Sequence, residues 1–381
     1  MRLKAIINGR LIVPDADGNF IVDDRSALVF DRLIGSIGST VDESDQVFDA
    51  RGMYVAPGFI NIHIHGCAGA DAMDAQPSAL ETMRSFLPST GVTSFLPTTM
   101  TMPIENIFAA LVRIRNEMNV RRGAKIIGAN VEGPFINKKF KGAQAEKDII
   151  AADFNLIKDF VDVIKLITIA PEELSDPSFI DECRRHGIIA SIGHSAADYQ
   201  TALNAIARGA SHITHLFNAQ TGLHHRKPGL VGAALDSHAV VELIADNVHV
   251  HPAAQRLVSK VKPRNEIILI TDSLRACGMG DGIFELGGQR VTVKGMRATL
   301  DDGTIAASVA PMNLVVKNFV DNSGWTLEAA LECATKNAAV ELGLYDRIGS
   351  LEVGKAADII IFDEALNIHA AFVDGNQVWS D

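Results

Sequence analysis

Two histidines separated by one residue, His63 and His65, are the first side chains in the sequence that could bind a metal ion together. They end the apolar run FINIHIH. Alternate residues of a β-strand point to the same face, so both imidazoles are expected on one side. Two such nitrogens can chelate one divalent cation. Taken alone, the pair fits a structural role equally well.

Four more residues that could bind a metal stand at the ends of other apolar, strand-like runs: Glu132, His194, His215 and Asp272. Their nitrogen and oxygen donors suit zinc, iron, manganese or cobalt. His249 follows the run VVELIADNV in a predicted loop and is the strongest candidate among the other histidines. The sequence therefore predicts a divalent metal site, provided that the fold brings these run ends together.

Eight apolar, β-branched runs provide the strands that could do so. Most are separated by segments with the period of an amphipathic helix, which is typical of successive βα units. Eight strands form a closed (β/α)8 barrel, where the C-terminal strand ends share one rim and build the active site. We therefore predict an α/β fold with a TIM-like barrel. The runs cover residues 59–65, 92–98, 125–132, 163–170, 188–194, 212–217, 240–245 and 266–271, and 212–217 has the weakest strand pattern.

Both ends of the chain have β-strand character. The first segments run from IINGRLIV, where Asn8 and Gly9 suggest a hairpin turn, to ALVFDRLIGSIG, and the last are ADIIIFD and AFVDGNQVW. Each piece is too small to be stable alone, so we predict that they pair into one small β-sandwich beside the barrel. The predicted division is 1–54 and 350–381 for the two parts of the sandwich and 55–349 for the barrel.

Composition limits the partners. The 381 residues exceed what one hydrophobic core usually holds, which favours a barrel with a smaller second domain. The net charge of -11 argues against nucleic acid or an anionic membrane as partner, whereas a small phosphorylated ligand needs only one or two cations. No apolar run could span a bilayer and the N-terminus lacks a signal-peptide pattern, so a cytoplasmic protein is expected.

The four cysteines are scattered, without the density of a disulfide framework or the close pairs of a zinc knuckle: Cys67, Cys183, Cys277 and Cys333. Reduced thiols are expected. Cys277, in TDSLRACG, could suggest a nucleophile, but no histidine is close to it in sequence and a metal-activated water leaves a thiol without a role. We predict a small buried hydrophobic residue at this position.

Taken together, many segments resemble the N-acetylglucosamine-6-phosphate deacetylases, a branch of the amidohydrolase superfamily. The His-x-His pair and the strand-end aspartate are shared by the whole superfamily. VEGPF with KGAQ, and HLFNA followed by RKPG, are closer to the deacetylase branch. The resemblance covers nearly the whole chain, through APGFINIHIHGCAGADAMD, GVTSFLPTTMT, NVEGPFINKKFKGAQ, TIAPE, GHSAA, THLFNA, HRKPGLVGAAL, ELIADNVHVHP, LITDS and IGSLEVGKAADIIIFD.

The resemblance implies the roles of the strand-end residues. Glu132, His194 and His215 match the principal metal ligands, and Asp272 matches the catalytic aspartate. Members that keep the His63 and His65 pair are expected to hold a second ion with Glu132 as a bridge, so one or two ions per subunit are expected.

The implied reaction is hydrolysis of the acetamide of N-acetyl-D-glucosamine 6-phosphate to D-glucosamine 6-phosphate and acetate. Metal-bound water is the expected nucleophile. Asp272 is the expected general base and then general acid.

The resemblance also implies how the substrate is held. Backbone amides around Asn218 and Ala219 are expected at the phosphate, with Arg226 and His249 supplying charge or hydrogen bonds. In the family the arginine comes from a neighbouring subunit, so Arg226 implies a homodimer.

Two further positions belong to this implied binding site. Gln144 stands where many members carry histidine; it can hydrogen-bond a sugar hydroxyl but does not titrate near neutral pH. Met312, in GTIAASVAPMN, packs either against the substrate or in the core.

Three other functions stay open at this point. The substrate could be N-acetylgalactosamine 6-phosphate, which differs in the orientation of one hydroxyl. A dihydroorotase-like amidohydrolase is disfavoured because such enzymes bridge two metals with a modified lysine, where this chain offers Glu132. A catalytically inactive barrel that only binds a ligand would usually have lost a ligand residue or the proton-transfer group.

Overall fold

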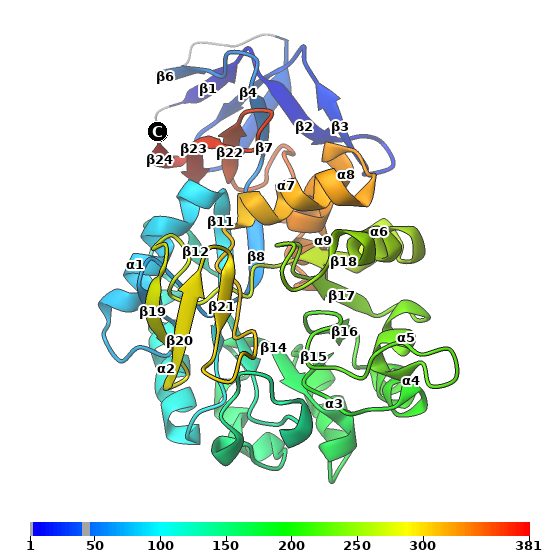
Figure 1. Cartoon of the computed structure of the whole chain (residues 1–381). Coiled ribbons are helices and arrows are strands. Elements are labelled where there is room, and N and C mark those ends of the chain that lie inside the picture. The colour runs from blue at the N-terminus through cyan, green and yellow to red at the C-terminus, as the bar shows by residue number, and fades with distance from the viewer. Residues whose placement is uncertain (1–2, 40–45) are drawn as a thin grey trace.

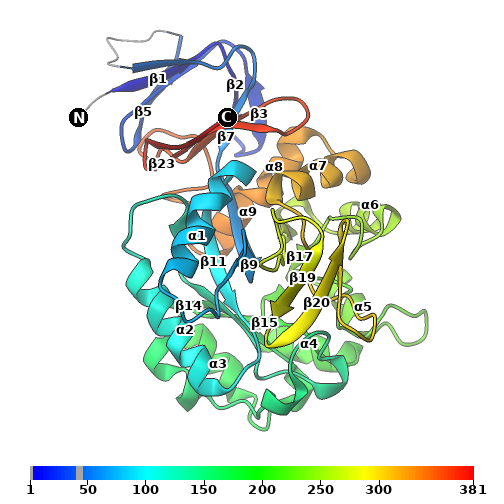
Figure 2. The same cartoon turned by 60° about the vertical axis from the view of Figure 1, so that its left-hand side comes forward.

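The computed structural model describes residues 3–39 and 46–381. Figure 1 shows a barrel ringed by helices and, above it, a β-rich part with strands from both ends of the chain. A turn of 60° in Figure 2 shows the C-terminus beside the N-terminal strands. The predicted fold class, a TIM-like barrel with a small β-sandwich, is confirmed.

All eight predicted runs contribute to the barrel sheet, whose strand pairs are parallel. Strands covered on both faces are mostly apolar, as in the fully buried β8, where only Asn61 and His63 are polar. The third run is divided around Gly128, whose φ of 145° disfavours any residue with a side chain, and the sixth forms only two residues of strand. The strands are β8 (Phe59–Ile64), β11 (Val92–Thr99), β12 (Lys125–Ile126), β13 (Ala129–Glu132), β14 (Ile164–Ile169), β15 (Ile189–Ile192), β16 (His212–Ile213), β17 (Val240–Leu243) and β18 (Ile267–Leu269).

Backbone hydrogen bonds between β8 and the segment after β18 bring the two ends of the barrel together. The amide of Asp272 donates to the carbonyl of His63, and the amide of His65 donates to the carbonyl of Ser273, both at 2.9 Å. Asp272, three residues after the end of β18, therefore lies next to the histidine pair at the end of β8.

Helices cover the outside of the barrel and turn an apolar stripe toward the strands. In α2 the buried side chains Ile107, Ala110, Leu111 and Ile114 follow the spacing of one helix face. Within the described ranges, no helix is long and apolar enough to cross a membrane. The helices are α1 (Ser78–Phe86), α2 (Ile104–Glu117), α3 (Ser178–Arg185), α4 (Tyr199–Arg208), α5 (Gly229–Leu235), α6 (Pro252–Val261), α7 (Met312–Ser323), α8 (Leu327–Ala334) and α9 (Lys336–Glu341).

One crossover departs from the βα pattern. Residues 133–163, between β13 and β14, are all described and contain short 3-10 turns but no α-helix. This segment does not return along the outside as a helix. Instead, it contributes several residues to the pocket at the rim of the barrel.

The β-sandwich combines strands from both ends of the chain. In its larger sheet β22 pairs with β7, and β7 pairs with β2. Apolar side chains from both ends, including Ile6, Leu11, Ile359 and Phe372, form its core. The strands are β1 (Lys4–Ile7), β2 (Arg10–Pro14), β3 (Phe20–Asp23), β4 (Ala27–Phe30), β5 (Ile34–Gly38), β6 (Gln46–Asp49), β7 (Tyr54–Pro57), β22 (Ile359–Phe362), β23 (Ile368–Val373) and β24 (Asn376–Ser380).

The turn at Asn8 and Gly9 does not form the hairpin that the sequence suggested. Asn8 has the left-handed φ of 54° typical of a turn, but β1 and β2 on either side of it belong to different sheets. Their apolar side chains Ile6 and Leu11 instead share the core between the sheets. Burial of Ile6 and Leu11 against residues far from the turn therefore decides which strands β1 and β2 pair with.

A small antiparallel sheet that the sequence analysis missed follows Asp272, and it is yellow in Figures 1 and 2. It consists of β19 (Gly282–Leu286), β20 (Gln289–Lys294) and β21 (Arg297–Thr299). Gly287 and Gly288, with φ of 57° and 80°, form its first turn. A Gly-Gly pair between alternating apolar and polar residues is a hairpin signal that could have predicted it. A short hairpin of two strands with two residues each, β9 (Gly66–Cys67) and β10 (Ala70–Asp71), follows β8.

Candidate active site

The six residues that the sequence placed at strand ends meet at the C-terminal rim of the barrel. All are buried, and the most exposed of them, Asp272, retains 8% of its surface. They form two groups of three. Within each group, the atoms that could bind a metal all lie within 4.8 Å of one another. One group is His63, His65 and Asp272, and the other is Glu132, His194 and His215.

The carboxylate of Glu132, the last residue of β13, lies between the two groups. Its Oε1 is 3.4 Å from Nε2 of His63, 3.1 Å from Nε2 of His194 and 2.9 Å from Nε2 of His215. Its Oε2 is 3.2 Å from Nε2 of His65. One carboxylate therefore faces four imidazoles, as a bridging ligand would.

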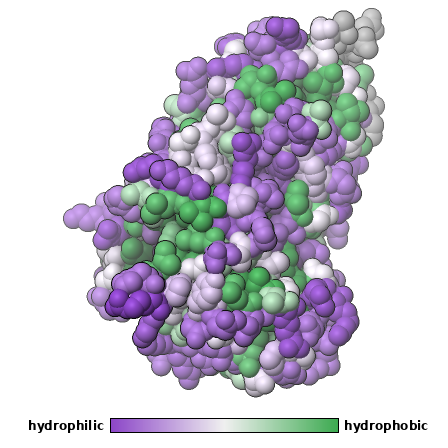
Figure 3. Space-filling view, turned by 90° about the vertical axis from the view of Figure 1, so that its right-hand side faces the viewer, coloured by the Kyte–Doolittle hydropathy of each residue, from purple (hydrophilic) through white to green (hydrophobic). Residues whose placement is uncertain are grey.

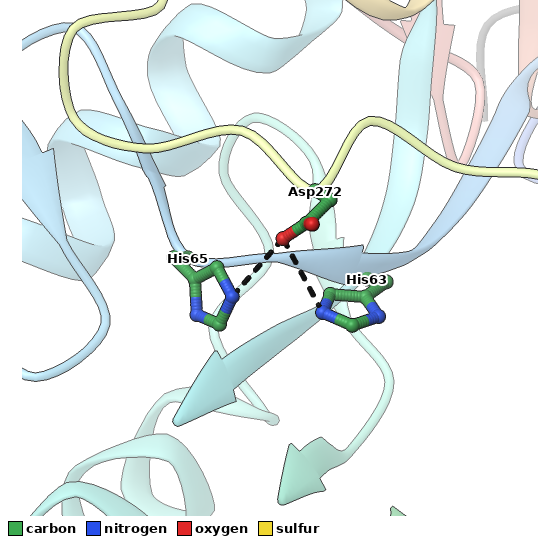
Figure 4. Close-up of side chains that lie close together, drawn as sticks. All are labelled: His63, His65 and Asp272. Carbon is green, nitrogen blue, oxygen red and sulfur yellow. Dashed lines mark ion pairs between the residues drawn. The ribbon is translucent and has the colours of Figure 1, made fainter. Parts of the chain in front are cut away.

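Asp272 contacts the two histidines of the first group through a single oxygen. Oδ1 lies 3.1 Å from Nε2 of His65 and 3.5 Å from Nε2 of His63, as Figure 4 shows. Oδ2 has no hydrogen-bond partner within the described ranges, and Asp272 lines the pocket at the rim. One oxygen is thus held in place while the other is available to a ligand.

Three of the six residues have a left-handed backbone conformation. The φ angles are 47° for His194, 30° for His215 and 48° for Asp272. Such strain costs about 1–3 kcal/mol per residue, persists only where the surroundings impose it, and clusters at functional sites. At Asp272, hydrogen bonds of 2.9 Å from its amide to His63 and from the Ser308 amide to its carbonyl impose the conformation.

Three of the four histidines use Nδ1 for a hydrogen bond outside the centre. The Nδ1 partners are a Glu242 carboxylate oxygen for His63 (2.9 Å), the Thr98 carbonyl for His65 (3.2 Å) and the Phe140 carbonyl for His194 (2.9 Å). A ring that donates its hydrogen from Nδ1 carries a lone pair on Nε2. When a metal displaces the Nε2 protons, these rings can therefore present electron pairs to the centre.

The arrangement of these lone pairs fits a cation. The Nε2 atoms of His194 and His215 lie only 3.1 Å apart and face the same oxygen of Glu132. Nε2 of His63 is buried and finds no hydrogen-bond partner among the described residues. Imidazole nitrogens around carboxylate oxygens, with the second ring nitrogen anchored, are the donor set of a first-row divalent ion.

Charge in the site keeps both acids ionised. Burial would raise the pKa of Glu132 and of Asp272, but the positive charge of His63 and contacts with other histidines hold both below their ordinary values. Burial lowers the pKa of His65, yet hydrogen bonds to Asp272 and Glu132 raise it to about 10. Since a metal binds only the unprotonated ring, protons compete with metal for this site.

A cavity of about 360 Å³ opens over these residues. Its walls include the predicted substrate residues Gln144, Asn218, Ala219 and His249. His249 bonds Asp246 through Nδ1 at 2.7 Å, so its Nε2 is the nitrogen available to a ligand. The structure therefore brings four of the six predicted substrate residues to one pocket.

Hydrogen bonds within the protein determine which groups of Asn218, Ala219 and Gln144 are available to a substrate. The Asn218 amide donates to the His215 carbonyl at 3.0 Å, whereas the Ala219 amide has no partner among residues 3–39 and 46–381. Gln144 accepts from the Thr101 amide at 2.7 Å and donates to Glu132 at 2.6 Å. Gln144 therefore supports the bridging carboxylate, and both of its polar atoms are engaged.

Two predicted substrate residues lie outside the pocket. Met312, at the start of α7, is fully buried in the barrel core, which is the core-packing alternative of the sequence analysis. Arg226 is exposed in a neighbouring recess, which shares Phe140 with the pocket, and its guanidinium contacts His225. In its own subunit Arg226 does not line the pocket.

Sequence analysis missed several residues of the pocket wall. Among the described residues that line the pocket, Lys139 is the only Lys or Arg. Thr304, Ile305 and Ala306 reach the pocket from the segment after β21. The two consecutive lysines before KGAQ were a signal for a cation here. Thr304 to Ala306 belong to GTIAASVAPMN, from which the sequence analysis named only Met312. The unpredicted β19–β21 sheet leads the chain to them.

Cys277 is buried, as predicted, and has no role at the pocket. Burial raises the pKa of its thiol to about 12. A thiol with this pKa is protonated near neutral pH and is a poor nucleophile. All four cysteines are free and buried.

Known proteins resemble this chain in sequence and in fold. The amidohydrolase family matches residues 54–378. The chain is 44% identical to an N-acetylglucosamine-6-phosphate deacetylase of Bacillus subtilis over 84% of this chain and 83% of that protein. It is 35% identical to an N-acetylgalactosamine-6-phosphate deacetylase of Escherichia coli O157:H7 over 93% of this chain and 94% of that protein. A crystal structure of N-acetylglucosamine-6-phosphate deacetylase from Pasteurella multocida superposes with a TM-score of 0.94 and 32% identity, over the whole of both chains.

Proposed function

The chain belongs to the amidohydrolase family, and from this premise we propose that it hydrolyses the acetamide of N-acetyl-D-glucosamine 6-phosphate to D-glucosamine 6-phosphate and acetate. The observation that carries the proposal is the pocket in which Asp272 stands beside a carboxylate shared by four imidazoles. The similar proteins from Bacillus subtilis and Pasteurella multocida, which bear the name of this activity, support the choice of substrate.

Two groups of residues would hold the metal. Glu132, His194 and His215 fit the principal ion, and His63, His65 and Asp272 fit a second one beside the bridging Glu132. A divalent ion in such a site lowers the pKa of a bound water toward about 7 and withdraws charge from the carbonyl oxygen. Zinc, iron, manganese and cobalt all suit this donor set.

Asp272 transfers the proton. Its free Oδ2 accepts a proton from the attacking water as the water oxygen bonds to the carbonyl carbon. The same oxygen then gives the proton to the amide nitrogen as the carbon–nitrogen bond breaks. His65 and His63 hold Oδ1, which keeps the carboxylate oriented during both transfers.

The outer wall of the pocket binds the phosphate. The free amide of Ala219, Nε2 of His249 and the ammonium group of Lys139 provide hydrogen-bond donors and charge there. This binding lies away from the acetamide. It therefore contributes mainly to affinity and to orientation of the sugar.

Replacing Lys139 by glutamine is expected to raise KM about tenfold and to leave kcat nearly unchanged. Its exposed ammonium contributes one charge-assisted contact, whose loss weakens ground state and transition state alike. Steady-state kinetics on the phosphorylated substrate measure both constants. Lys138→Gln is the matched control, because Lys138 is equally exposed but does not line the pocket. An unchanged KM in Lys139→Gln would contradict the assignment.

The exposed position of Arg226 supports a homodimer in which it reaches the partner's pocket. Figure 3 shows hydrophobic patches on the side of the molecule that carries α4, α5 and α6 at the right of Figure 1. Leu223, three residues before Arg226, is 61% exposed. Exposed apolar surface of this kind fits a subunit interface.

Mixing two inactive variants tests this arrangement. Asp272→Asn and Arg226→Gln subunits are each expected to be poorly active, but a mixed dimer contains one complete site. Activity should therefore rise after the two are unfolded, mixed and refolded together. The same procedure on each variant alone is the control. No gain on mixing would exclude exchange of Arg226 between subunits.

Acetate release by the purified, metal-loaded protein tests the function itself. The values of kcat/KM for the N-acetylglucosamine and N-acetylgalactosamine 6-phosphates are compared with each of the four metals. We expect the glucosamine substrate to be preferred. The similarity to the galactosamine enzyme of Escherichia coli O157:H7 makes the reverse preference the second candidate function. Absence of acetate release from both would refute the proposal.

A further inference from the structure

Glu242 is a buried carboxylate that the reaction does not use. It is the third residue of β17 and has no exposed surface. A buried carboxylate is costly unless hydrogen bonds and opposite charges compensate it. Its partners therefore indicate its role.

One oxygen of Glu242 holds a histidine from each of the two ligand groups. Oε2 accepts a hydrogen bond from Nδ1 of His63 at 2.9 Å and another from the backbone amide of His215 at 3.0 Å. The first bond orients an imidazole ring. The second holds the backbone of a residue whose φ of 30° is strained.

His63 differs from the other three histidines in its anchor. Nδ1 of His65 and of His194 bonds a backbone carbonyl, and Nδ1 of His215 has no partner in the described part of the chain. Only His63 is anchored by a carboxylate. A carboxylate acceptor fixes the tautomer and makes the opposite nitrogen a stronger metal ligand.

The other oxygen of Glu242 faces a compensating charge. Oε1 lies 3.4 Å from Nε2 of His212, whose Nδ1 lies 3.2 Å from Oε1 of Glu341. Burial alone would lower the pKa of His212, but hydrogen bonds to Glu242 and Glu341 raise it to about 9. A protonated His212 keeps Glu242 ionised inside the barrel.

We propose that Glu242 is a positioning residue that creates the second cation site, because it commits His63 to binding through Nε2 and holds that ring against the bridging Glu132. The inference rests on the proposed metal-dependent function. Without Glu242, the group of Glu132, His194 and His215 keeps its three side-chain ligands and loses only the hydrogen bond to the backbone amide of His215. The group of His63, His65 and Asp272 instead loses the bond that orients one of its ligand rings.

Binding of Co²⁺ alone to the full-length, metal-stripped protein tests this role. Equilibrium dialysis gives the number of ions and their affinities, and the visible absorption spectrum reports the ligands of each ion. We expect two ions in the wild type. In Glu242→Gln, the weaker ion should bind about 10- to 100-fold less tightly, while the tighter ion stays within a few-fold of wild type.

Glu266→Gln is the matched control. Glu266 is also buried and also accepts a hydrogen bond from a histidine Nδ1, that of His238 at 2.8 Å, but it lies outside the site. It should bind both ions as the wild type does. The proposal is overturned if Glu242→Gln binds two ions with wild-type affinity, or if both ions weaken equally, since the latter indicates only general damage.

A measurement on the wild type keeps the proposal testable if Glu242→Gln does not fold. Nitrogen-15 NMR of the zinc-loaded, histidine-labelled protein should show a ring with hydrogen on Nδ1 and zinc on Nε2. This signal is assigned to His63 by its loss in His63→Gln. Hydrogen on Nε2 of His63, or coordination through Nδ1, would overturn the proposal.

The same samples separate this inference from the proposed function. Two-ion binding that depends on Glu242, in a protein that releases no acetate from either sugar phosphate, refutes the deacetylase function alone. Acetate release together with metal binding that does not depend on Glu242 refutes the positioning role alone.

Discussion

Asp272→Asn is expected to lower kcat by about 10²- to 10⁴-fold, the range over which a positioned general acid–base group accelerates a reaction. Asparagine has the shape of aspartate, and its amide oxygen can take the place of Oδ1 beside His65 and His63. An amide, however, does not accept a proton at the position of Oδ2. Proton removal from water and protonation of the leaving nitrogen should both fail.

Steady-state kinetics and metal analysis of the same preparation measure this effect. KM and the content of the ion held by Glu132, His194 and His215 should stay close to wild type, because these ligands and the phosphate contacts are unchanged. An ion held by His63, His65 and Asp272 should bind less tightly. Asp71→Asn is the control. Asp71 is buried and close enough to His65 for their charges to interact, but it belongs to neither group, so this variant should keep most of the kcat. A wild-type kcat in Asp272→Asn would contradict the proposed role of Asp272 in proton transfer.

Glu132→Gln is expected to lose metal from both groups and to have no measurable deacetylase activity. The carboxylate meets four imidazoles, and its Oε1 alone lies within 3.4 Å of three of them. An amide keeps the size of the side chain but lacks the negative charge that would bridge two ions. The loss should exceed the about 10- to 100-fold that follows loss of an outer partner.

Metal analysis after purification without added metal is the direct measurement, with chelator-treated wild type as the reference. Glu172→Gln is the matched control. Glu172 bonds Ser195 Oγ at 2.7 Å, next to His194, but faces none of the metal-binding imidazoles. It should retain metal and activity. Wild-type metal content in Glu132→Gln would contradict the bridging role.

The fold was largely predictable because its signals are local. Each barrel strand is an apolar run of a few residues, and each candidate ligand stands at the end of such a run. The small sheet after Asp272 was missed although the Gly287–Gly288 pair signalled it. The hairpin at Asn8 was wrong because a turn signal does not determine which sheet each strand joins. The domain boundaries near residues 54 and 350 stay predictions.

The sequence predicted which residues form the site, but it did not predict which of them contact one another. Strand ends placed Glu132, His194, His215 and Asp272 at one rim, as parallel strands in a barrel require. The sequence suggested a sugar contact for Gln144, whereas the structure engages its amide with Glu132 and Thr101. Glu242 drew no attention because it lies in the middle of a strand, where a carboxylate has no recognisable motif.

The sequence by itself determined which residue types stand at the ends of which strands, since periodicity and motifs belong to short segments of chain. Only the tertiary structure decided that His63 lies beside Asp272, that Glu132 is shared by two groups and that Arg226 is remote from its own pocket. The physical reason is that such distances depend on closure of the barrel and on packing of segments far apart in sequence. No local pattern encodes these distances.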